Sequence, residues 1–390
     1  MVVSNNSENA LAKYAEWTAW CPRCNSCKYI YRDYSISCPA GEHFKFETYW
    51  SSGKVWIAHG LLTGKLNWSP ELAKIIYACP LCGSCAEQCQ QDISEHLLDI
   101  FEALREEAVN QGVGPYGSQK EFGESIINNN NPYKESHADR LNWLDEKITK
   151  KSAEVLYFVG CTSSYREKEL AKATYDLLKK AGVDFCVSAD EVCCGSPALR
   201  TGQKKLVYDL IEKNLKLFKN LGIKTVVTSC AGCYRTLKID YPKIINKSLD
   251  VKIMHISEFI NSLITQDKIK IEKEKPIKIT YHDPCHLGRH SGVFDEPRVV
   301  LKSIPKLELI EMRRIRENSW CCGAGGGVKS GFKDWAVEIA EERVKEAENT
   351  GAEYLITSCP FCLRNLRDAA KKMGSKMKIM GIVELLTNIL

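Results

Sequence analysis

Residues 224–233 read KTVVTSCAGC, and residues 354–362 read YLITSCPFC. Each stretch is a short apolar run, typical of a buried strand, that ends in two cysteines separated by two residues. Cys359 follows Cys230 by 129 positions, and segments on either side of the two stretches also correspond. These stretches therefore indicate an internal duplication in the second half of the chain.

Two further pairs of segments extend the duplication. Residues 154–160 (EVLYFVG) end at Cys161, and their counterpart, residues 277–281 (IKITY), leads to Cys285, 124 positions further on. Residues 253–264 (IMHISEFINSLI) correspond to residues 379–390 (IMGIVELLTNIL), which lie 126 positions later. The offsets are so similar that the two copies align with only small insertions.

The duplicated copies predict an α/β fold. In each copy, strand-like runs alternate with helical stretches such as residues 168–181 and 334–349, a pattern typical of a mainly parallel sheet. In such sheets, the chemistry gathers at the carboxyl ends of the strands. A cysteine follows four of the strand-like runs, at Cys161, Cys230, Cys285 and Cys359.

Each copy carries five cysteines in the same order, one, then a Cys-Cys pair, then a C-x2-C pair. Set one comprises Cys161, Cys193, Cys194, Cys230 and Cys233. Set two comprises Cys285, Cys321, Cys322, Cys359 and Cys362. Four ligands satisfy zinc, which would leave a fifth thiolate idle. Five thiolates suit a larger, multi-iron assembly, and Gly195 and Gly323, after the Cys-Cys pairs, are expected to let the backbone approach it.

The front of the chain carries two further cysteine runs. The second run, Cys79, Cys82, Cys85 and Cys89, has the bacterial ferredoxin spacing, in which the fourth cysteine ligates the other cluster. The first run differs, because ten residues with three tyrosines separate Cys27 from Cys38. We expect two cubane 4Fe–4S clusters here. Cluster one would use Cys21, Cys24, Cys27 and Cys89, and cluster two would use Cys79, Cys82, Cys85 and Cys38. Zinc sites usually show two C-x2-C pairs instead.

The sequence thus divides into four parts. Residues 1–110 are expected to form a helical ferredoxin-like domain with two 4Fe–4S clusters. Residues 111–151, rich in Gly, Asn and Pro, are expected to be a linker. The two duplicated α/β cysteine-rich domains are expected at residues 152–266 and 267–390.

Composition narrows the class of protein. Apolar residues make up 44% and charged residues 26% of the 390 residues, and the net charge is only +5, which does not favour nucleic-acid binding. Neither a run of about 18 apolar residues nor the basic, apolar start of a signal peptide is present, which favours the cytoplasm. In that reducing compartment, 19 cysteines indicate metal or redox chemistry instead of disulfides.

Three stretches carry a resemblance to a known family. They are residues 193–195 (CCG), 321–327 (CCGAGGG) and 283–288 (DPCHLG). With them, the chain resembles the cysteine-rich, or CCG, domain family, and within it the D subunit of heterodisulfide reductases. The resemblance covers nearly the whole chain, including the cysteine runs at the front.

The resemblance implies a function and cofactors. In this family, each complete five-cysteine set binds a noncubane 4Fe–4S cluster, and a disulfide held between two such clusters is cleaved in one-electron steps. Set one and set two would then each hold one cluster. The chain is accordingly expected to be a disulfide reductase subunit, with electrons entering through the two cubanes and a substrate such as the coenzyme M–coenzyme B heterodisulfide. A redox partner is expected: a b-type cytochrome, a flavoprotein or another iron–sulfur subunit. Contact with a membrane would occur only through such a partner.

Two other functions remain open. Some family members are electron-transfer subunits of flavin-dependent glycolate, lactate or glycerol-3-phosphate dehydrogenases, and they are not thought to reduce a disulfide. The completeness of both five-cysteine sets favours the reductase. A zinc-stabilised interaction protein is the third interpretation, and it predicts a colourless preparation.

Three histidines flank Cys285, at positions 282, 286 and 290. His286 is the candidate proton donor to a leaving thiolate, since histidine titrates near neutrality and His286 adjoins an expected ligand. A hydrogen-bond partner that tunes the cluster is the alternative. Arg289 is the candidate for binding an anionic group of the substrate, with a structural role as its alternative. Cys186 belongs to neither set and is expected to be a buried core thiol.

Overall fold

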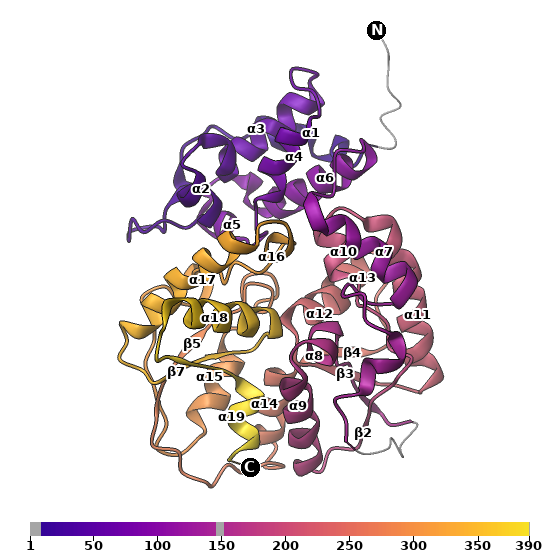
Figure 1. The fold of residues 1–390 in the computed structure, drawn as a ribbon, viewed down its shortest axis with the longest axis vertical. Coiled ribbons are helices and arrows are strands. Elements are labelled where there is room, and N and C mark those ends of the chain that lie inside the picture. Colours follow the sequence, from indigo (N-terminus) through magenta and orange to yellow (C-terminus); the bar gives the residue numbers. More distant parts are fainter. Residues whose placement is uncertain (1–8, 146–151, 390) are drawn as a thin grey trace.

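The computed structural model describes residues 9–145 and 152–389, and it has a helical front part and two α/β copies (Figure 1). The front part is mainly helical, and four of its helices have eight residues or fewer. These helices are α1 (Ala15–Ala19), α2 (Pro39–Phe44), α3 (Ser51–Leu62), α4 (Pro70–Tyr77), α5 (Ser84–Gln88) and α6 (Leu97–Asn110). Within the described ranges, no helix is long and apolar enough to cross a membrane.

The first copy contains a four-stranded parallel sheet of order β2-β1-β3-β4. Its central strands are buried on both faces, as apolar runs between covering helices require. The strands are β1 (Val155–Tyr157), β2 (Phe185–Cys186), β3 (Thr225–Thr228) and β4 (Lys252–His255). The helices are α8 (Cys161–Tyr165), α9 (Lys168–Lys180), α10 (Ser196–Arg200), α11 (Val207–Asn220), α12 (Ala231–Arg235), α13 (Tyr241–Ile245) and α14 (Ile256–Thr265).

The second copy repeats this arrangement with a parallel sheet of order β6-β5-β7-β8. The strands are β5 (Lys278–His282), β6 (Glu308–Leu309), β7 (Tyr354–Thr357) and β8 (Lys378–Gly381). The helices are α15 (Asp295–Lys302), α16 (Val328–Gly331), α17 (Lys333–Glu348), α18 (Pro360–Met373) and α19 (Ile382–Thr387). The predicted mixed α/β class, with a duplicated cysteine-rich unit, is confirmed.

Strand register matches the two copies residue by residue. Tyr157 of β1 pairs with Val227 of β3, and Tyr281 of β5 pairs with Ile356 of β7. The hydroxyls of both tyrosines meet the serine that follows the neighbouring strand, at 3.2 Å in the first copy and 3.1 Å in the second. Tyr281 is therefore the counterpart of Tyr157, and the residue after it, His282, is the counterpart of Phe158.

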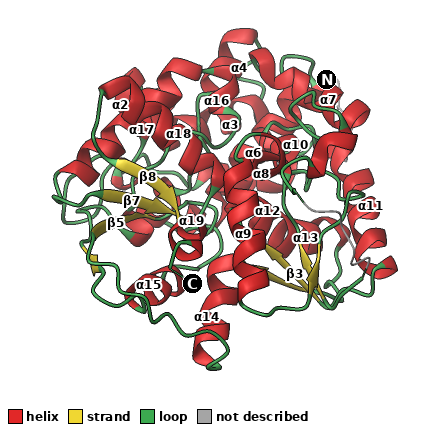
Figure 2. Cartoon of the chain, turned by 60° about the horizontal axis from the view of Figure 1, so that its bottom comes forward, coloured by secondary structure: helices red, strands yellow, loops and turns green. Residues whose placement is uncertain are grey.

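The two copies pack through equivalent helices. Helix α9 of the first copy packs against α19 of the second, and α14 of the first packs against α15 of the second. Figure 2 shows α9 and α19 between the two sheets. A buried hydrogen bond also crosses between the copies, because His255 Nε2 lies 3.0 Å from the Ser358 carbonyl oxygen. The carboxyl ends of β4 and β7 are therefore held together.

The expected linker contains helix α7 (Lys120–Asn129) and side chains that are buried against the first copy. Arg140 is 1% exposed and forms a 2.7 Å ion pair with Glu191. The Cys193 amide donates a 2.9 Å hydrogen bond to the Asn130 carbonyl oxygen. Residues 146–151 of the expected linker, and the chain ends at residues 1–8 and 390, lie outside the described residues. The domain limits given above stay predictions.

One buried arginine joins all three parts of the chain. Arg105, on α6, is fully buried. Its guanidinium donates to the carbonyl oxygens of Arg200 in the first copy at 2.5 Å and Gly326 in the second at 2.6 Å. It also donates to the Cys79 carbonyl oxygen in the front part. Because these carbonyls have lost contact with water, Arg105 is central to the packing of the three parts.

Candidate active site

The 19 cysteines all lie within the described ranges, and none of them forms a disulfide. Those of the two duplicated copies are all buried, whereas Cys24 in the front part is exposed. Buried thiols outside disulfides, in such number, indicate ligands for metal. The way in which the fold groups them shows which thiols can share one site.

In the front part, the two cysteine runs exchange their fourth members. Front set A comprises Cys21, Cys24, Cys27 and Cys89. Burial raises the pKa of Cys27 to about 11, and the three other thiols of this set lie within its electrostatic reach. Front set B comprises Cys38, Cys79, Cys82 and Cys85. Burial raises the pKa of Cys38 to about 12, with Cys79 and Cys82 nearby. Cys85 lies near the other three. The structure thus brings together the two groups expected from the ferredoxin pattern, Cys38 included.

The thiols of set one form a continuous row. Cys161 lies beside Cys193, Cys193 beside Cys194, Cys194 beside Cys233, and Cys233 beside Cys230. Hydrogen bonds, chiefly from Cys193 and then from Cys233, lower the pKa of Cys194 to about 6. Hydrogen bonds with Cys194 and Cys230 raise the pKa of Cys233, because a thiol that donates to a neighbouring thiolate holds its proton. All five thiols of set one are therefore close enough to share one assembly.

Set two has a similar arrangement. Cys321 lies beside Cys322, Cys322 beside Cys362, and Cys362 beside Cys359. Hydrogen bonds from Cys321 and Cys362 hold the pKa of Cys322 well below its ordinary value. Burial raises the pKa of Cys285, whose thiol lies within electrostatic reach of Cys322 and Cys359.

Three junctions connect the four groups of cysteines. Cys27 of front set A lies within electrostatic reach of Cys85 of front set B. Cys82 of front set B is hydrogen-bonded to Cys321 of set two. Cys359 of set two is hydrogen-bonded to Cys230 of set one, and this bond holds the pKa of Cys359 well below its ordinary value. The groups therefore follow one another from a surface-exposed cysteine to the interior of the molecule.

A cavity of ≈ 360 Å³ lies between the two copies, next to set two. That volume falls within the usual range for small-ligand sites. Four of the five set-two cysteines line it, together with His286, Ala231 and Gly232 of the first copy, and several arginines and lysines. The lining cysteines are Cys285, Cys322, Cys359 and Cys362. The lining cations are Arg166, Arg200, Lys329, Lys333 and Arg364. The cavity therefore combines thiols with positive charge.

The two residues singled out around Cys285 lie differently. His286 lines the cavity, and its Nδ1 is 3.4 Å from Cys285 Sγ. Burial lowers the pKa of His286 well below its ordinary value, so the ring is neutral. Arg289 is not among the cavity-lining residues. Its guanidinium donates to the carbonyl oxygens of Cys82 at 2.7 Å and Ser319 at 2.6 Å. Arg289 thus joins the front part to the second copy. This is a structural role, the alternative to substrate binding that the sequence left open.

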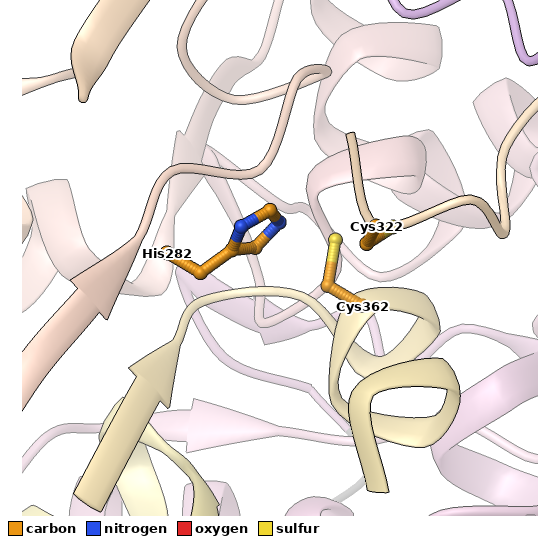
Figure 3. A group of neighbouring side chains, drawn as sticks. All are labelled: His282, Cys322 and Cys362. Atoms are coloured by element: carbon orange, nitrogen blue, oxygen red, sulfur yellow. The ribbon is translucent and has the colours of Figure 1, made fainter. Parts of the chain in front are cut away.

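His282 is a functional candidate that the sequence analysis named but did not select. A ring nitrogen of His282 and the sulfurs of Cys322 and Cys362 all lie within 4.8 Å of one another. Figure 3 shows the ring turned toward the side chains of Cys362 and Cys322. The comparison of the two copies contained the signal, because Phe158 occupies the equivalent position beside set one.

Comparisons with known proteins agree with this geometry. A family model described as a cysteine-rich domain, CCG, matches residues 155–238 and 279–367. The D subunit of the dihydromethanophenazine:CoB–CoM heterodisulfide reductase of Methanosarcina mazei is 44% identical over 81% of this chain and 78% of its own length. The chain belongs to the CCG domain family of iron–sulfur oxidoreductases. The predicted resemblance to this family is confirmed.

A second relative and a solved structure extend the comparison. One subunit of the fumarate reductase (CoM/CoB) of Methanothermobacter marburgensis, another CoM/CoB enzyme by name, is 36% identical over 80% of this chain and 61% of its own length. A hypothetical protein from Helicobacter pylori superimposes with a TM-score of 0.59, over 99% of this chain and 72% of that chain. At 12% sequence identity, this likeness shows a similar fold and nothing more.

The donor atoms of this CCG protein fit iron–sulfur clusters. The Gly195 amide donates to Cys193 Sγ at 3.4 Å, and the Gly323 amide donates to Cys321 Sγ at 3.2 Å. Such N–H···S bonds stabilise the thiolate form that iron binds. At Gly160, an added Cβ would lie 2.9 Å from Cys233 Sγ, so the backbone passes close to set one. The Oγ atoms of Ser163 and Ser164, just after Cys161, are buried without a hydrogen-bond partner among the protein atoms described.

The glycines near the Cys-Cys pairs also have a role in packing. Gly195 and Gly323 have φ values of +91° and +79°, in the left-handed region. An added Cβ at Gly323 would meet the Ala336 carbonyl oxygen of α17 at 2.3 Å. At Gly326, it would meet the Cys79 carbonyl oxygen at 2.7 Å. These glycines therefore permit close packing against a helix and against the front part.

Proposed function

We propose that this chain is the disulfide-reducing subunit of an iron–sulfur complex, with the coenzyme M–coenzyme B heterodisulfide as its candidate substrate. Its membership of an oxidoreductase family and its likeness to the D subunit of a heterodisulfide reductase support the proposal. The observation that carries it is the cavity between the copies, because cysteines of set two line its wall and set one begins directly behind them, at Cys230.

The four groups of cysteines would hold the cofactors. Front sets A and B would each hold a cubane 4Fe–4S cluster, and sets one and two would each hold a noncubane 4Fe–4S cluster. When bound, these clusters supply one-electron transfer. The protein contributes the buried thiols, the amide groups that stabilise thiolates, and the order in which the groups follow one another. Because Cys24 is exposed, the cluster of front set A would lie at the surface, within reach of a redox partner.

His286 is our candidate proton donor. It lies in the cavity wall beside Cys285, so it is within reach of a disulfide bound there. Reductive cleavage of a disulfide by two electrons yields two thiolates, and each takes up one proton to become a thiol. The ring can relay a solvent proton to one of these sulfurs, since one ring nitrogen can take up a proton as the other releases its own. Its position at the cavity wall supports this role.

An anaerobic assay tests the function. The purified protein should contain close to 16 irons, which is about four clusters of the four-iron type. Given reduced viologen and the CoM–CoB heterodisulfide, it should oxidise two viologens for each disulfide cleaved and release two thiols. Full iron without turnover on this or other small disulfides would instead favour the electron-transfer subunit of a flavin dehydrogenase. A colourless, iron-free protein would exclude both functions.

Arg364 is the residue of the cavity best suited to bind an anionic group. It lies two residues after Cys362, at the position that Arg235 occupies after Cys233 in the first copy. Arg235 forms ion pairs with Glu102 at 3.3 Å and Asp240 at 3.5 Å. Arg364 lines the cavity and, across the described ranges, has no hydrogen bond or ion pair. Its charge is thus available to a sulfonate, phosphate or carboxylate.

Replacing Arg364 with methionine should raise KM for the anionic heterodisulfide about 10- to 100-fold and change kcat little. The reason is that a charge-assisted hydrogen bond contributes about 1.5–3 kcal/mol and would be lost from substrate binding. Steady-state kinetics with an anionic and a neutral disulfide measure this effect. Lys371→Met is the matched control, since it removes one positive charge from the exposed end of the same helix, away from the cavity. Equal losses with both disulfides would contradict the role of Arg364.

A further inference from the structure

The surroundings of the two five-cysteine sets differ at the carboxyl end of the first strand of each copy. His282 ends β5 beside set two and is 1% exposed, whereas its counterpart Phe158 follows β1 beside set one. Phe158 is fully buried and packs edge-to-face on Phe218, with ring centroids 6.4 Å apart. The duplicated copies therefore present a polar ring to one set and an apolar ring to the other.

Arg343 determines which nitrogen of His282 carries the proton. Its Nε donates to His282 Nδ1 at 3.1 Å. A guanidinium has only donors, so Nδ1 must be the acceptor and must lack a proton. With Nδ1 accepting from Arg343, the ring N–H of His282 lies on Nε2.

The position of Arg343 is itself fixed. The side chain is fully buried on α17. One terminal nitrogen donates to the Arg314 carbonyl oxygen and to Glu346 Oε2, both at 2.8 Å. The other donates to Ser319 Oγ at 3.2 Å. With each nitrogen bonded, the guanidinium cannot turn away from His282, so the tautomer is built into the fold.

The Nε2 hydrogen faces the sulfurs of set two. Nε2 is buried and has no hydrogen-bond partner in the part of the chain that the structure describes. Figure 3 shows that the ring points toward Cys362 and Cys322. A buried N–H group without an acceptor costs folding free energy. The metal-binding thiolates of Cys322 and Cys362 are nearby acceptors for it.

We propose that His282 is a positioning residue that donates an Nε2–H···S hydrogen bond to the cysteine sulfurs of set two and so raises the reduction potential of the cluster held there. This inference rests on the cofactor assignment proposed above. The donor draws electron density from the thiolate, which favours the reduced state. Set one lacks an equivalent imidazole. There the Arg140 guanidinium, paired with Glu191, lies 3.6 and 3.8 Å from Cys161 Sγ. The two sets are therefore chemically distinct.

Redox titration of the iron-loaded protein, without any disulfide, tests the inference. The signal of set two is the one that the Cys322→Ser variant lacks. In His282→Leu, the reduction equilibrium of that signal should shift about tenfold toward the oxidised state, about 59 mV for a one-electron couple. His282→Gln should retain most of the reduction potential of the unaltered protein, because its amide can accept from Arg343 and donate to sulfur. Phe158→Leu, at the equivalent place in the first copy, should leave the signal unchanged.

Nitrogen-15 hyperfine spectroscopy on histidine-labelled, unaltered protein provides a readout that does not depend on a variant folding. We expect weak couplings typical of hydrogen-bonded rings from His282 and from His286, whose Nδ1 lies 3.4 Å from Cys285 Sγ, and His282→Gln should remove only the His282 coupling. A strong coupling, typical of a nitrogen bound to iron, would overturn the inference, as would an unshifted potential in fully loaded His282→Leu. Absence of any cluster signal from set two in the unaltered protein would overturn the cofactor assignment as well.

Discussion

The Cys322→Ser protein is expected to lose disulfide turnover by at least about 100-fold, while its iron content falls only from close to 16 to about 12. Cys322 lies in the middle of the set-two row, between Cys321 and Cys362, and it lines the cavity. A change in an outer-shell partner typically costs 10–100-fold in metal affinity or activity, and loss of a central ligand should cost more. The front sets and set one have their own thiols and should remain loaded.

Cys186→Ala is the matched control. Cys186 is buried in β2 and belongs to none of the four groups. Its removal should leave the iron content and the turnover unchanged. Cys194→Ser should remove a comparable amount of iron from set one and also abolish turnover, although Cys194 does not line the cavity. Iron analysis together with the viologen assay measures both effects. Normal turnover in Cys322→Ser, with about 12 irons, would show that set two is not needed for the reaction.

The second large effect is expected from Arg105→Leu, which should lower the free energy of unfolding by about 3–5 kcal/mol. The substitution leaves buried carbonyl oxygens of the front part and of both copies without donors, and each such group costs about 1–3 kcal/mol. We expect the thermal midpoint to fall by roughly 4–6 °C. Anaerobic differential scanning fluorimetry of the iron-loaded protein measures this change.

Arg313→Leu is the control for that experiment. Arg313 also connects the second copy to the front part, through Asp33, but its side chain is 67% exposed. An exposed ion pair contributes at most about 1 kcal/mol, so the midpoint should move little. Equal midpoints for Arg105→Leu and Arg313→Leu would show that the parts are held together mainly by other contacts.

Much of the fold was predictable because its signals are local. The strand-like runs before Cys230 and Cys359 have the apolar, β-branched composition of strands buried on both faces, and they form β3 and β7. Repetition strengthened these signals, since the same run, cysteine spacing and helix recur at nearly constant offsets. The expected linker was less predictable. Its Gly, Asn and Pro content is typical of loops, and yet it contains α7 and buries Arg140 against Glu191.

In the candidate site, too, some features were predictable from local sequence and others were not. The membership of each five-cysteine set follows from spacing, and the fold brings each set together. The selection of Arg289 for substrate binding relied on closeness in sequence to Cys285. In the folded chain, its donors face main-chain carbonyls, and Arg364, from a helix about 75 positions later, lines the cavity. Sequence distance carries no information on which way a side chain points across an interface.

The sequence by itself determined the α/β class, the duplication, the two five-cysteine sets and the relation to the CCG family. These properties depend on hydrophobic periodicity and on ligand spacing within short segments. Only the tertiary structure decided that Cys82 meets Cys321, that Cys230 meets Cys359, and that Arg343 fixes the proton of His282. Each of these contacts joins segments from 61 to more than 200 residues apart. Such contacts depend on how whole elements pack, which local sequence does not specify.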